Sequence, residues 1–453
     1  MLTRNSNNSS AKEAQSSLLQ RAQNILSQNH TGHFTKPAPS LYPHQWNWDS
    51  GFIAMGYAHY HPELAMAELR ALFEGQWKNG MVPHIVFRER SEEEAVYFPG
   101  PDFWQSNLSP NAPDGLATSG ISQPPVHGMA LKRIAEISAD HPSTKAFIEE
   151  MWPKVAALNL FFYRERNPEG NGLVVFRHPW ESGTDNAPTW DVALARFDPD
   201  KVQIPSYQRL DLIHGKADQR PTQRDYDYYV HLIDIFRKCQ YDEAAMQEAC
   251  PFSMQDPLFN SLLLKSTEDL VDLGKAIGQD TLELETYASQ TRNSMNELLW
   301  NPETGLYHVR DQRTQTLLPH QIGSGFMPLM AGIPSMEQAD RMVEALLSPH
   351  FSGFAENKAN WLPTYDLQAP DFQPAKYWRG PVWVNLNWML CMGLRRYGHD
   401  AHADALQEQT LRLVEQAGFH EYFHPYGVAG NPTGLGTHSF SWTAALVIDW
   451  LNE

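Results

Sequence analysis

Residues 418–432 have the sequence Gly-Phe-His-Glu-Tyr-Phe-His-Pro-Tyr-Gly-Val-Ala-Gly-Asn-Pro. Within it, His420–His424 match the pattern H-E-x-x-H, which binds zinc when a helix presents both histidines on one face. Residues that end or break a helix surround the pattern: Gly418, Pro425, Gly427, Gly430 and Pro432. We therefore predict an irregular loop carrying Glu421, and no metal ligand at His420 or His424.

The rest of the chain is dominated by helical periodicity. The segments with this pattern are 11–28, 49–60, 62–77, 125–139, 144–165, 226–241, 257–277, 280–299, 322–331, 336–347, 381–397, 401–417 and 438–452. Alternation typical of strands is brief, at Gly172–Arg177 and Leu306–Arg310. Long loops rich in Pro, Gly, Trp and Asp separate the helices at 30–48, 79–123, 166–225, 350–380 and 418–437.

Loops that recur between helix pairs predict an all-α fold, an (α/α)6 barrel or helical toroid, with the site built from long loops at one end. No linker-like change of composition divides the chain, so we expect residues 1–453 to form a single catalytic domain. The insertions at about 79–123 and 166–225 are candidates for a lid or a small subdomain.

The composition of the chain argues against some classes of partner. A net charge of −18 argues against nucleic acid and against an anionic membrane surface as partners. Three cysteines, no apolar N-terminal segment and no run of about 18 apolar residues predict a cytoplasmic protein without a disulfide framework. The sequence leaves the oligomeric state open, and a homo-oligomer is possible.

Tryptophan and tyrosine are abundant, at 14 and 17 residues, and many stand beside Gly, Pro or Asp.

Two aromatic motifs are typical of a sugar site, where ring faces stack on C–H surfaces and carboxylates hold hydroxyls. One is residues 41–51, Leu-Tyr-Pro-His-Gln-Trp-Asn-Trp-Asp-Ser-Gly, in which Asp49 is placed to accept sugar hydroxyls. The other is residues 377–383, Tyr-Trp-Arg-Gly-Pro-Val-Trp. The alternatives are a helix cap at Asp49 or Ser50 and an aromatic helix-entry packing motif.

Two further segments supply carboxyl groups. Residues 180–191, Trp-Glu-Ser-Gly-Thr-Asp-Asn-Ala-Pro-Thr-Trp-Asp, contain Asp185, whose pKa flanking tryptophans would raise by desolvation. The alternative is an Asx-turn at Asp185-Asn186. The second is Glu421, followed by Gly-Leu-Gly-Thr-His-Ser-Phe-Ser-Trp at 434–442. We expect both acids on solvent-accessible loops, and together they are the pair that glycoside hydrolysis requires.

These motifs, in this order, resemble glycoside hydrolase family 63, and most of all its short bacterial mannosylglycerate and glucosylglycerate hydrolases. The resemblance implies an (α/α)6 barrel that hydrolyses a small-molecule α-glycoside with inversion and without a metal or other cofactor. It implies Asp185 as general acid and Glu421 as general base. Residues implied to surround the sugar are Tyr42, Trp46, Asp49, Tyr377, Trp378, Gly380 and Trp383.

The resemblance also implies residues that choose the aglycone. The segment 219–226, Gln-Arg-Pro-Thr-Gln-Arg-Asp-Tyr, is similar to hydrolases whose Arg and Tyr hold the glycerate carboxylate, here Arg220 and Tyr226. The alternative is a surface arginine capped by the next helix. His84, Tyr97 and Gln123 match weaker site positions. Residues 428–433, Val-Ala-Gly-Asn-Pro-Thr, replace the family's short Thr-Gly-Glu turn.

The favoured function is therefore hydrolysis of glucosylglycerate or mannosylglycerate. One alternative keeps the chemistry on a neutral substrate such as glucosylglycerol, trehalose or a short α-gluco-oligosaccharide. Others are a sugar isomerase or epimerase on a similar toroid with histidine as acid or base, a zinc peptidase, and a non-catalytic sugar-binding protein.

Overall fold

The computed structural model describes residues 2–88, 97–198, 202, 204–214, 216–351 and 362–453. Its centre is a closed ring of six parallel inner segments, each contacting the next, with the last contacting the first. In ring order they are α2 (Asn47–Ala58), α5 (His127–Ile137), α11 (Pro257–Ala276), the 3-10 segment η6 (Gly323–Leu329), α14 (Val384–Arg396) and α16 (Ser441–Asn452).

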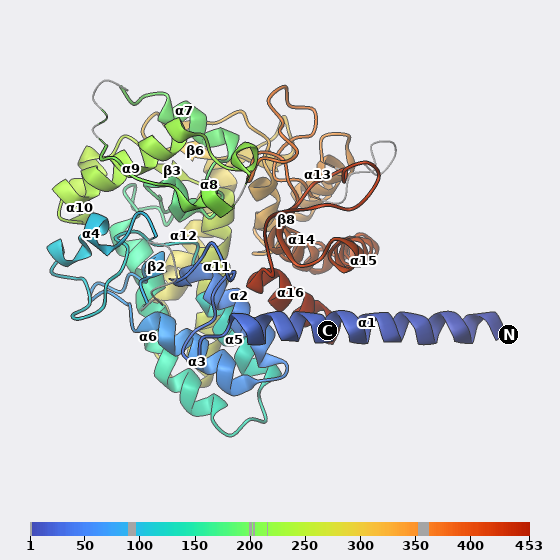
Figure 1. Cartoon of the computed structure of the whole chain (residues 1–453). Helices are drawn as coiled ribbons and strands as arrows, with labels where there is room; N and C mark the ends of the chain where they lie inside the picture. The colour runs from blue at the N-terminus through green and yellow to red at the C-terminus, as the bar shows by residue number, and fades with distance from the viewer. Residues whose placement is uncertain (1, 89–96, 199–201, 203, 215, 352–361) are drawn as a thin grey trace.

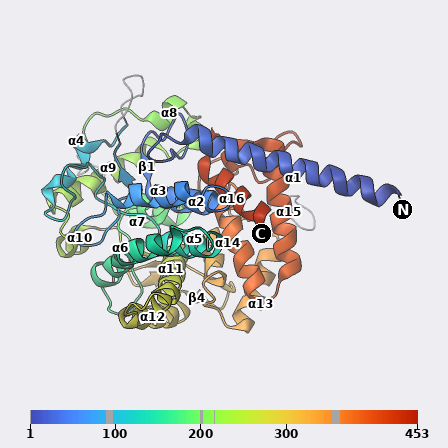
Figure 2. The ribbon, with the colours of Figure 1, turned by 90° about the horizontal axis from the view of Figure 1, so that it is seen from below.

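An outer helix precedes each inner segment in the chain. The outer helices are α1 (Leu2–Asn29), α3 (Pro62–Phe73), α6 (Thr144–Glu165), α12 (Leu282–Leu298), α13 (Met336–Leu347) and α15 (Asp400–Ala417). Six inner and six outer segments in alternation confirm the predicted (α/α)6 barrel. Helix α1 packs along α16, and its N-terminal part extends past the body of the molecule (Figures 1 and 2).

Burial explains which helices are inside. All twelve residues of α2 are buried, as expected of a helix that is apolar on every face. Glycines let the inner helices approach closely. A Cβ at Gly56 would lie 2.6 Å from Ala445 Cα on α16, and one at Gly128 would lie 2.3 Å from the Ser266 carbonyl oxygen on α11.

The predicted long loops contain short elements. In 79–123 and the stretch from 166 to 250 these are α4 (Pro101–Trp104), η1 (Ser106–Leu108), η2 (Pro179–Ser182), η3 (Pro188–Trp190), α7 (Asp191–Leu194), α8 (Leu210–His214), η5 (Ala217–Gln219), α9 (Gln223–Lys238) and α10 (Glu243–Ala249). Helix α9 begins with a capping box in which Thr222 and Asp225 exchange hydrogen bonds.

The strands are short and all their pairings are antiparallel. β1 (Gln45–Trp46) pairs with β2 (Ile85–Val86), and β4 (Trp300–Asn301) pairs with β5 (Leu306–Tyr307). β6 (Arg310–Asp311) lies between β3 (Met254–Gln255) and β7 (Thr316–Leu317). β8 (His420–Phe423) pairs with β9 (Gly434–His438).

Three predictions of local structure were wrong. Gly172–Arg177 forms only an isolated bridge, because the Val174 amide donates to Asn260 Oδ1 and the Val175 amide to the Arg166 carbonyl. The predicted helix at 322–331 is a 3-10 segment, with Pro328 inside it.

The third error concerns 418–437, which is a hairpin and not an irregular loop. Its turn residues Ala429 and Gly430 have φ of 51° and 79°, the conformation of a two-residue type I′ turn. Pro425, Gly427, Gly430 and Pro432 lie in the connection at 424–433 between the two strands, and Gly418 precedes the first strand. Within the described ranges, no helix is long and apolar enough to cross a lipid bilayer.

Candidate active site

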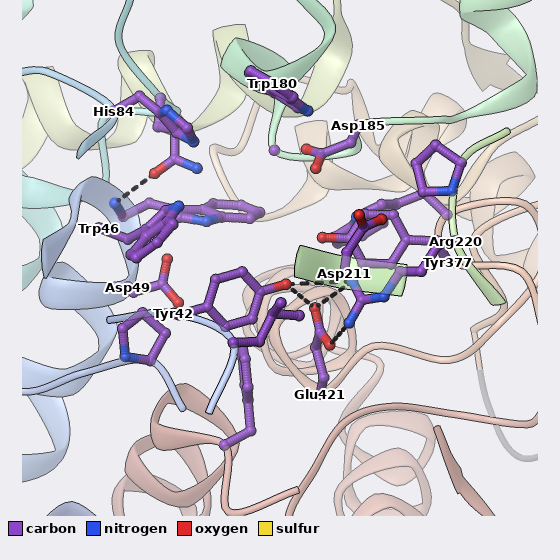
Figure 3. Close-up of a pocket in the computed structure, with 18 of the residues that line it drawn as sticks. Tyr42, Trp46, Asp49, His84, Trp180, Asp185, Asp211, Arg220, Tyr377 and Glu421 are labelled. Carbon is purple, nitrogen blue, oxygen red and sulfur yellow. Dashed lines mark hydrogen bonds and ion pairs between the residues drawn. The ribbon is translucent and has the colours of Figure 1, made fainter. Parts of the chain in front are cut away.

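A pocket with about 810 Å³ of empty space, including its open mouth, lies at the end of the barrel where inner helices begin. Figure 3 shows Asp185 and Glu421 facing this space from different segments of the chain. The lining residues are Pro37, Leu41, Tyr42, Trp46, Trp48, Asp49, His84, Tyr97, Phe98, Gln123, Trp180, Gly183, Asp185, Leu210, Asp211, Arg220, Pro221, Tyr226, Tyr377, Trp378, Trp383, Glu421, Phe440 and Trp442.

Asp185 stands on the turn between η2 and η3. This turn packs closely against the start of α2. Gly183 has φ 75°, and a Cβ at this position would lie 2.6 Å from the Trp48 ring, so only glycine fits. Burial, and then the negative charge of Glu421, raise the pKa of Asp185 to about 7. A carboxyl group with that pKa can carry a proton near neutral pH and donate it.

The backbone beside Asp185 is tied to the second aromatic motif. Asn186 Oδ1 accepts a hydrogen bond of 2.9 Å from the Trp378 amide, and Arg379 forms a two-armed ion pair with Asp191, at 3.0 and 2.8 Å. Asp191 therefore fixes the loop that carries Tyr377 and Trp378. Tyr377 itself has a left-handed backbone, φ 45°, a rare conformation for a bulky side chain and one that recurs at functional sites.

Glu421 lies on strand β8 and is only 1% exposed, so both the expected loop and the expected solvent access were wrong. Its carboxylate accepts four hydrogen bonds. Oε1 accepts from the Tyr42 hydroxyl at 2.6 Å and Arg220 Nη1 at 3.3 Å, while Oε2 accepts from Arg220 Nη2 at 2.7 Å and the Thr437 amide at 3.0 Å. Four donors converging on an acceptor-only group fix its orientation.

Arg220 is 3% exposed, which excludes the alternative of a surface arginine. It follows η5 and precedes the capped start of α9, so its backbone is fixed on both sides. Besides pairing with Glu421, its guanidinium lies over the Tyr377 ring, 4.8 Å from the centroid.

A stack of rings forms one wall. Trp378 and Trp383 are parallel with centroids 3.8 Å apart, and Tyr422 continues the stack 4.8 Å from Trp383. Tyr422 is on the same strand as Glu421, so strand β8 carries both this carboxylate and one ring of the stack. Such a surface matches the C–H faces of a pyranose.

Asp49 lies in the first turn of α2, but no side-chain cap bond forms at that helix start. Burial, and then the charges of Glu421 and Asp185, raise its pKa well above the usual value. The cap alternative therefore fails at this position. The raised pKa favours the protonated form of Asp49, and a protonated carboxyl group can donate hydrogen bonds to hydroxyls as well as accept them.

The structure brings all but one of the predicted site residues together. Those that line the pocket are Tyr42, Trp46, Asp49, His84, Tyr97, Gln123, Asp185, Arg220, Tyr226, Tyr377, Trp378, Trp383 and Glu421. Gly380 does not line it. Its amide donates to Thr364 Oγ1 at 2.9 Å, and a Cβ there would lie 2.6 Å from the Gln373 carbonyl oxygen, so its role is in packing.

Sequence reasoning missed Asp211, which lines the pocket from α8 and is held by Arg209 at 3.0 and 2.6 Å. No motif marks this position, because its neighbours in sequence lie in a long loop. Trp48 and Trp442 were inside motifs quoted above but were not assigned to the site.

The zinc motif has no helix to support it, since His420–Phe423 is a strand. Among the described residues, no group of three or more His, Cys, Asp or Glu could hold a metal ion. The single histidine among the lining residues of the described chain is His84, and burial lowers its pKa to about 3. Such a histidine is neutral and is a poor acid or base at neutral pH.

Comparison with known proteins identifies the family. Residues 42–443 match the family described as mannosylglycerate hydrolase MGH1-like glycoside hydrolase domain. The mannosylglycerate hydrolase of Rubrobacter radiotolerans is 42% identical, over 96% of this chain and 97% of that protein. The glucosylglycerate hydrolase of Mycolicibacterium hassiacum is 34% identical, over 96% and 97%.

A solved structure agrees. The family 63 mannosylglycerate hydrolase of Thermus thermophilus, crystallised with Tris and D-glycerate, has a TM-score of 0.87 and 38% identity, covering 96% of this chain and 99% of that one. The chain is a member of glycoside hydrolase family 63. This membership confirms the resemblance and the prediction of a glycosidase, and it sets aside the isomerase and peptidase alternatives. Neutral trehalase Nth1 of Saccharomyces cerevisiae, with a TM-score of 0.57 and 16% identity, shares the fold alone.

Proposed function

We propose that this family 63 enzyme is an inverting α-glycosidase that hydrolyses glucosylglycerate or mannosylglycerate to the free sugar and glycerate. The observation that carries the proposal is a pocket in which one carboxyl group, Asp185, has its pKa raised to about 7 while another, Glu421, is held by four donors. These are the states that a general acid and a general base need.

In the proposed reaction, Glu421 takes a proton from a water molecule whose oxygen bonds to the anomeric carbon. The bond from that carbon to the aglycone oxygen breaks, and Asp185 gives its proton to the leaving oxygen. The sugar would lie against Trp378 and Trp383, with Asp49 bonded to its hydroxyls. Attack on the face opposite the leaving group inverts the configuration at the anomeric carbon.

The aglycone end is proposed to include Arg220, Tyr226, Tyr97 and Gln123. Arg220 is the one cationic side chain among the lining residues of the described chain, beside the acids Asp49, Asp185, Asp211 and Glu421. An anionic aglycone needs such a partner, because the pocket and the whole chain are otherwise acidic. The names of the relatives, which include both mannosylglycerate and glucosylglycerate hydrolases, support glycerate as the aglycone and leave the sugar open.

We also propose that residues 1–453 form one catalytic domain, with parts of 79–123 and 166–225 acting as a lid. Phe98 from the first insertion stacks on Tyr207 from the second, with centroids 4.6 Å apart and planes 13° apart. Phe98 and Leu210 both line the pocket, so the two insertions meet beside it.

The test is a panel of pure substrates: α-glucosylglycerate, α-mannosylglycerate, α-glucosylglycerol and trehalose, compared by kcat/KM. The proposal predicts that one or both glycerates are preferred. A preference for glucosylglycerol or trehalose would replace the glycerate assignment with the neutral alternative and leave the roles of Asp185 and Glu421 to be tested separately.

A further inference from the structure

The guanidinium of Arg220 is already engaged on one edge. Its two terminal nitrogens bond to both oxygens of Glu421, and Nη1 also donates to the Tyr42 hydroxyl at 3.3 Å. Tyr42 in turn donates to Glu421 Oε1 at 2.6 Å, so Arg220, Tyr42 and Glu421 are all hydrogen-bonded to one another. Figure 3 shows the three side chains meeting, joined by dashed lines.

The other edge of the same guanidinium is unused. Nε of Arg220 is buried and has no hydrogen-bond partner among the described residues. An arginine has five N–H donors in a plane, and the Nε edge alone can hold a carboxylate with two parallel bonds. One guanidinium can therefore serve two carboxylates, although here protein atoms cover Nε, so a second carboxylate can bind this edge only after neighbouring side chains move.

We propose that Arg220 is a positioning residue for Glu421, holding the base for attack by water, in addition to binding the substrate carboxylate through its Nε edge. The second half rests on the proposed function, whereas the first half does not. A residue that only recognised the aglycone would have no reason to commit both terminal nitrogens to the base.

Two further features support a positioning role. Both side chains are almost fully buried, so removing one leaves the charge of the other largely uncompensated by solvent. The remaining donors to Glu421 are the Tyr42 hydroxyl, which reaches Oε1 alone, and the Thr437 amide, which reaches Oε2 alone. Among the described residues only Arg220 bridges the two oxygens, so its removal frees the carboxylate to rotate.

The experiment separates the two roles by substrate. An α-glucosyl or α-mannosyl fluoride has no aglycone to recognise and a leaving group that needs little acid, so its turnover reports the base step. We expect Arg220→Ala to lower kcat by about 100-fold on the fluoride and on the glycosylglycerate alike, the size of effect that misplacement by about 1 Å produces. KM should rise at least about tenfold for the glycosylglycerate only.

Two companions complete the design. Arg224→Ala, four residues along, is the matched control, because Arg224 is exposed and bonds to Tyr228 outside the pocket. It should leave both substrates unaffected. Arg220→Lys keeps the charge but cannot bridge two oxygens, so kcat on the fluoride should remain at least about tenfold low, and this variant decides the matter if Arg220→Ala does not fold.

Wild-type kcat on the fluoride in a folded Arg220 variant would overturn the positioning role. If kcat falls but KM for the glycosylglycerate does not rise, Arg220 does not bind the substrate carboxylate. The positioning role toward Glu421 would then still hold. If the wild-type enzyme rejects glycosylglycerates altogether, the proposed substrate fails, and the fluoride measurement still decides the role of Arg220 toward Glu421.

Discussion

The backbone of Gly436 passes so close to Glu421 that a Cβ at this glycine would lie 2.4 Å from Glu421 Oε2. The contact arises because β8 and β9 pair directly, with Tyr422 opposite Leu435. The adjoining amide, that of Thr437, donates to the same oxygen. Strand β9 therefore packs against the carboxylate as well as bonding to it, and a glycine is required where the two meet.

We predict that Gly436→Ala lowers kcat by about 100-fold or more, because the added methyl group must displace the Glu421 carboxylate. Its φ of 68° adds a stability cost of about 1 kcal/mol for a non-glycine residue. Gly430→Ala is the matched control, since Gly430 has φ 79° and no atom within 4 Å of the added Cβ. Similar melting temperatures with an activity loss confined to Gly436→Ala would bear this out, and equal activity in the two variants would contradict it.

Asp185→Asn and Glu421→Gln should each lower kcat by at least about 100-fold, as expected for loss of a general acid or base. On the glycosyl fluoride, kcat should fall far less in Asp185→Asn than in Glu421→Gln, because fluoride leaves without a proton. Steady-state rates on the two substrates check this. Normal turnover of the glycosylglycerate by either variant would remove that residue from its role.

The raised pKa of Asp185 predicts two pH effects. Since the acid must be protonated, kcat/KM should fall as pH rises through about 7. The pKa of Asp185 is higher in the folded protein than in the unfolded chain. The protonated carboxyl group therefore stabilises the folded state at low pH, and this stabilisation is lost as the pH rises through the pKa of the folded protein.

The Asp185→Asn variant cannot ionise at this position. The free energy of unfolding of the variant minus that of the wild type should therefore be larger at pH 8 than at pH 4.5, by roughly 2–3 kcal/mol. Denaturant unfolding of both proteins at the two pH values measures the difference. A difference independent of pH would show that Asp185 titrates normally in the folded enzyme.

Chelation should have no effect on activity, because His420 to Phe423 form a strand and His424 follows it, whereas a zinc site of this motif needs both histidines on one face of a helix. The measurement is activity before and after dialysis against EDTA, with a zinc add-back. Loss of activity on dialysis that zinc restores would contradict the metal-free mechanism.

The barrel could be predicted from sequence because helical periodicity is strong in long segments, and eleven of the expected stretches became α-helices of the ring in the expected order. The exception, η6, contains two glycines and Pro328, so its apolar pattern persists although α-helical hydrogen bonding does not. The alternation at Leu306–Arg310 did mark strand residues, since β5 and the start of β6 lie there, whereas the other two-residue strands are too short to display an alternation.

For the site, residue types predicted the chemistry and the structure added the partners. Motifs marked Asp185 and Glu421 through their Gly, Pro and aromatic neighbours, which are local features. The pairing of Arg220 with Glu421 joins positions 201 residues apart, and nothing in either segment indicates it. Asp211 was missed for the same reason, since only the fold brings α8 to the pocket.

The most direct test of the central claim is a ¹H NMR time course of the wild-type enzyme with α-glucosylglycerate and α-mannosylglycerate, recorded before the released sugar mutarotates. We expect β-glucose or β-mannose to appear first, together with glycerate, because in the proposed mechanism Glu421 directs water to the face opposite Asp185. First release of the α-anomer would contradict it, and no release of glycerate from either compound would refute the proposed substrate.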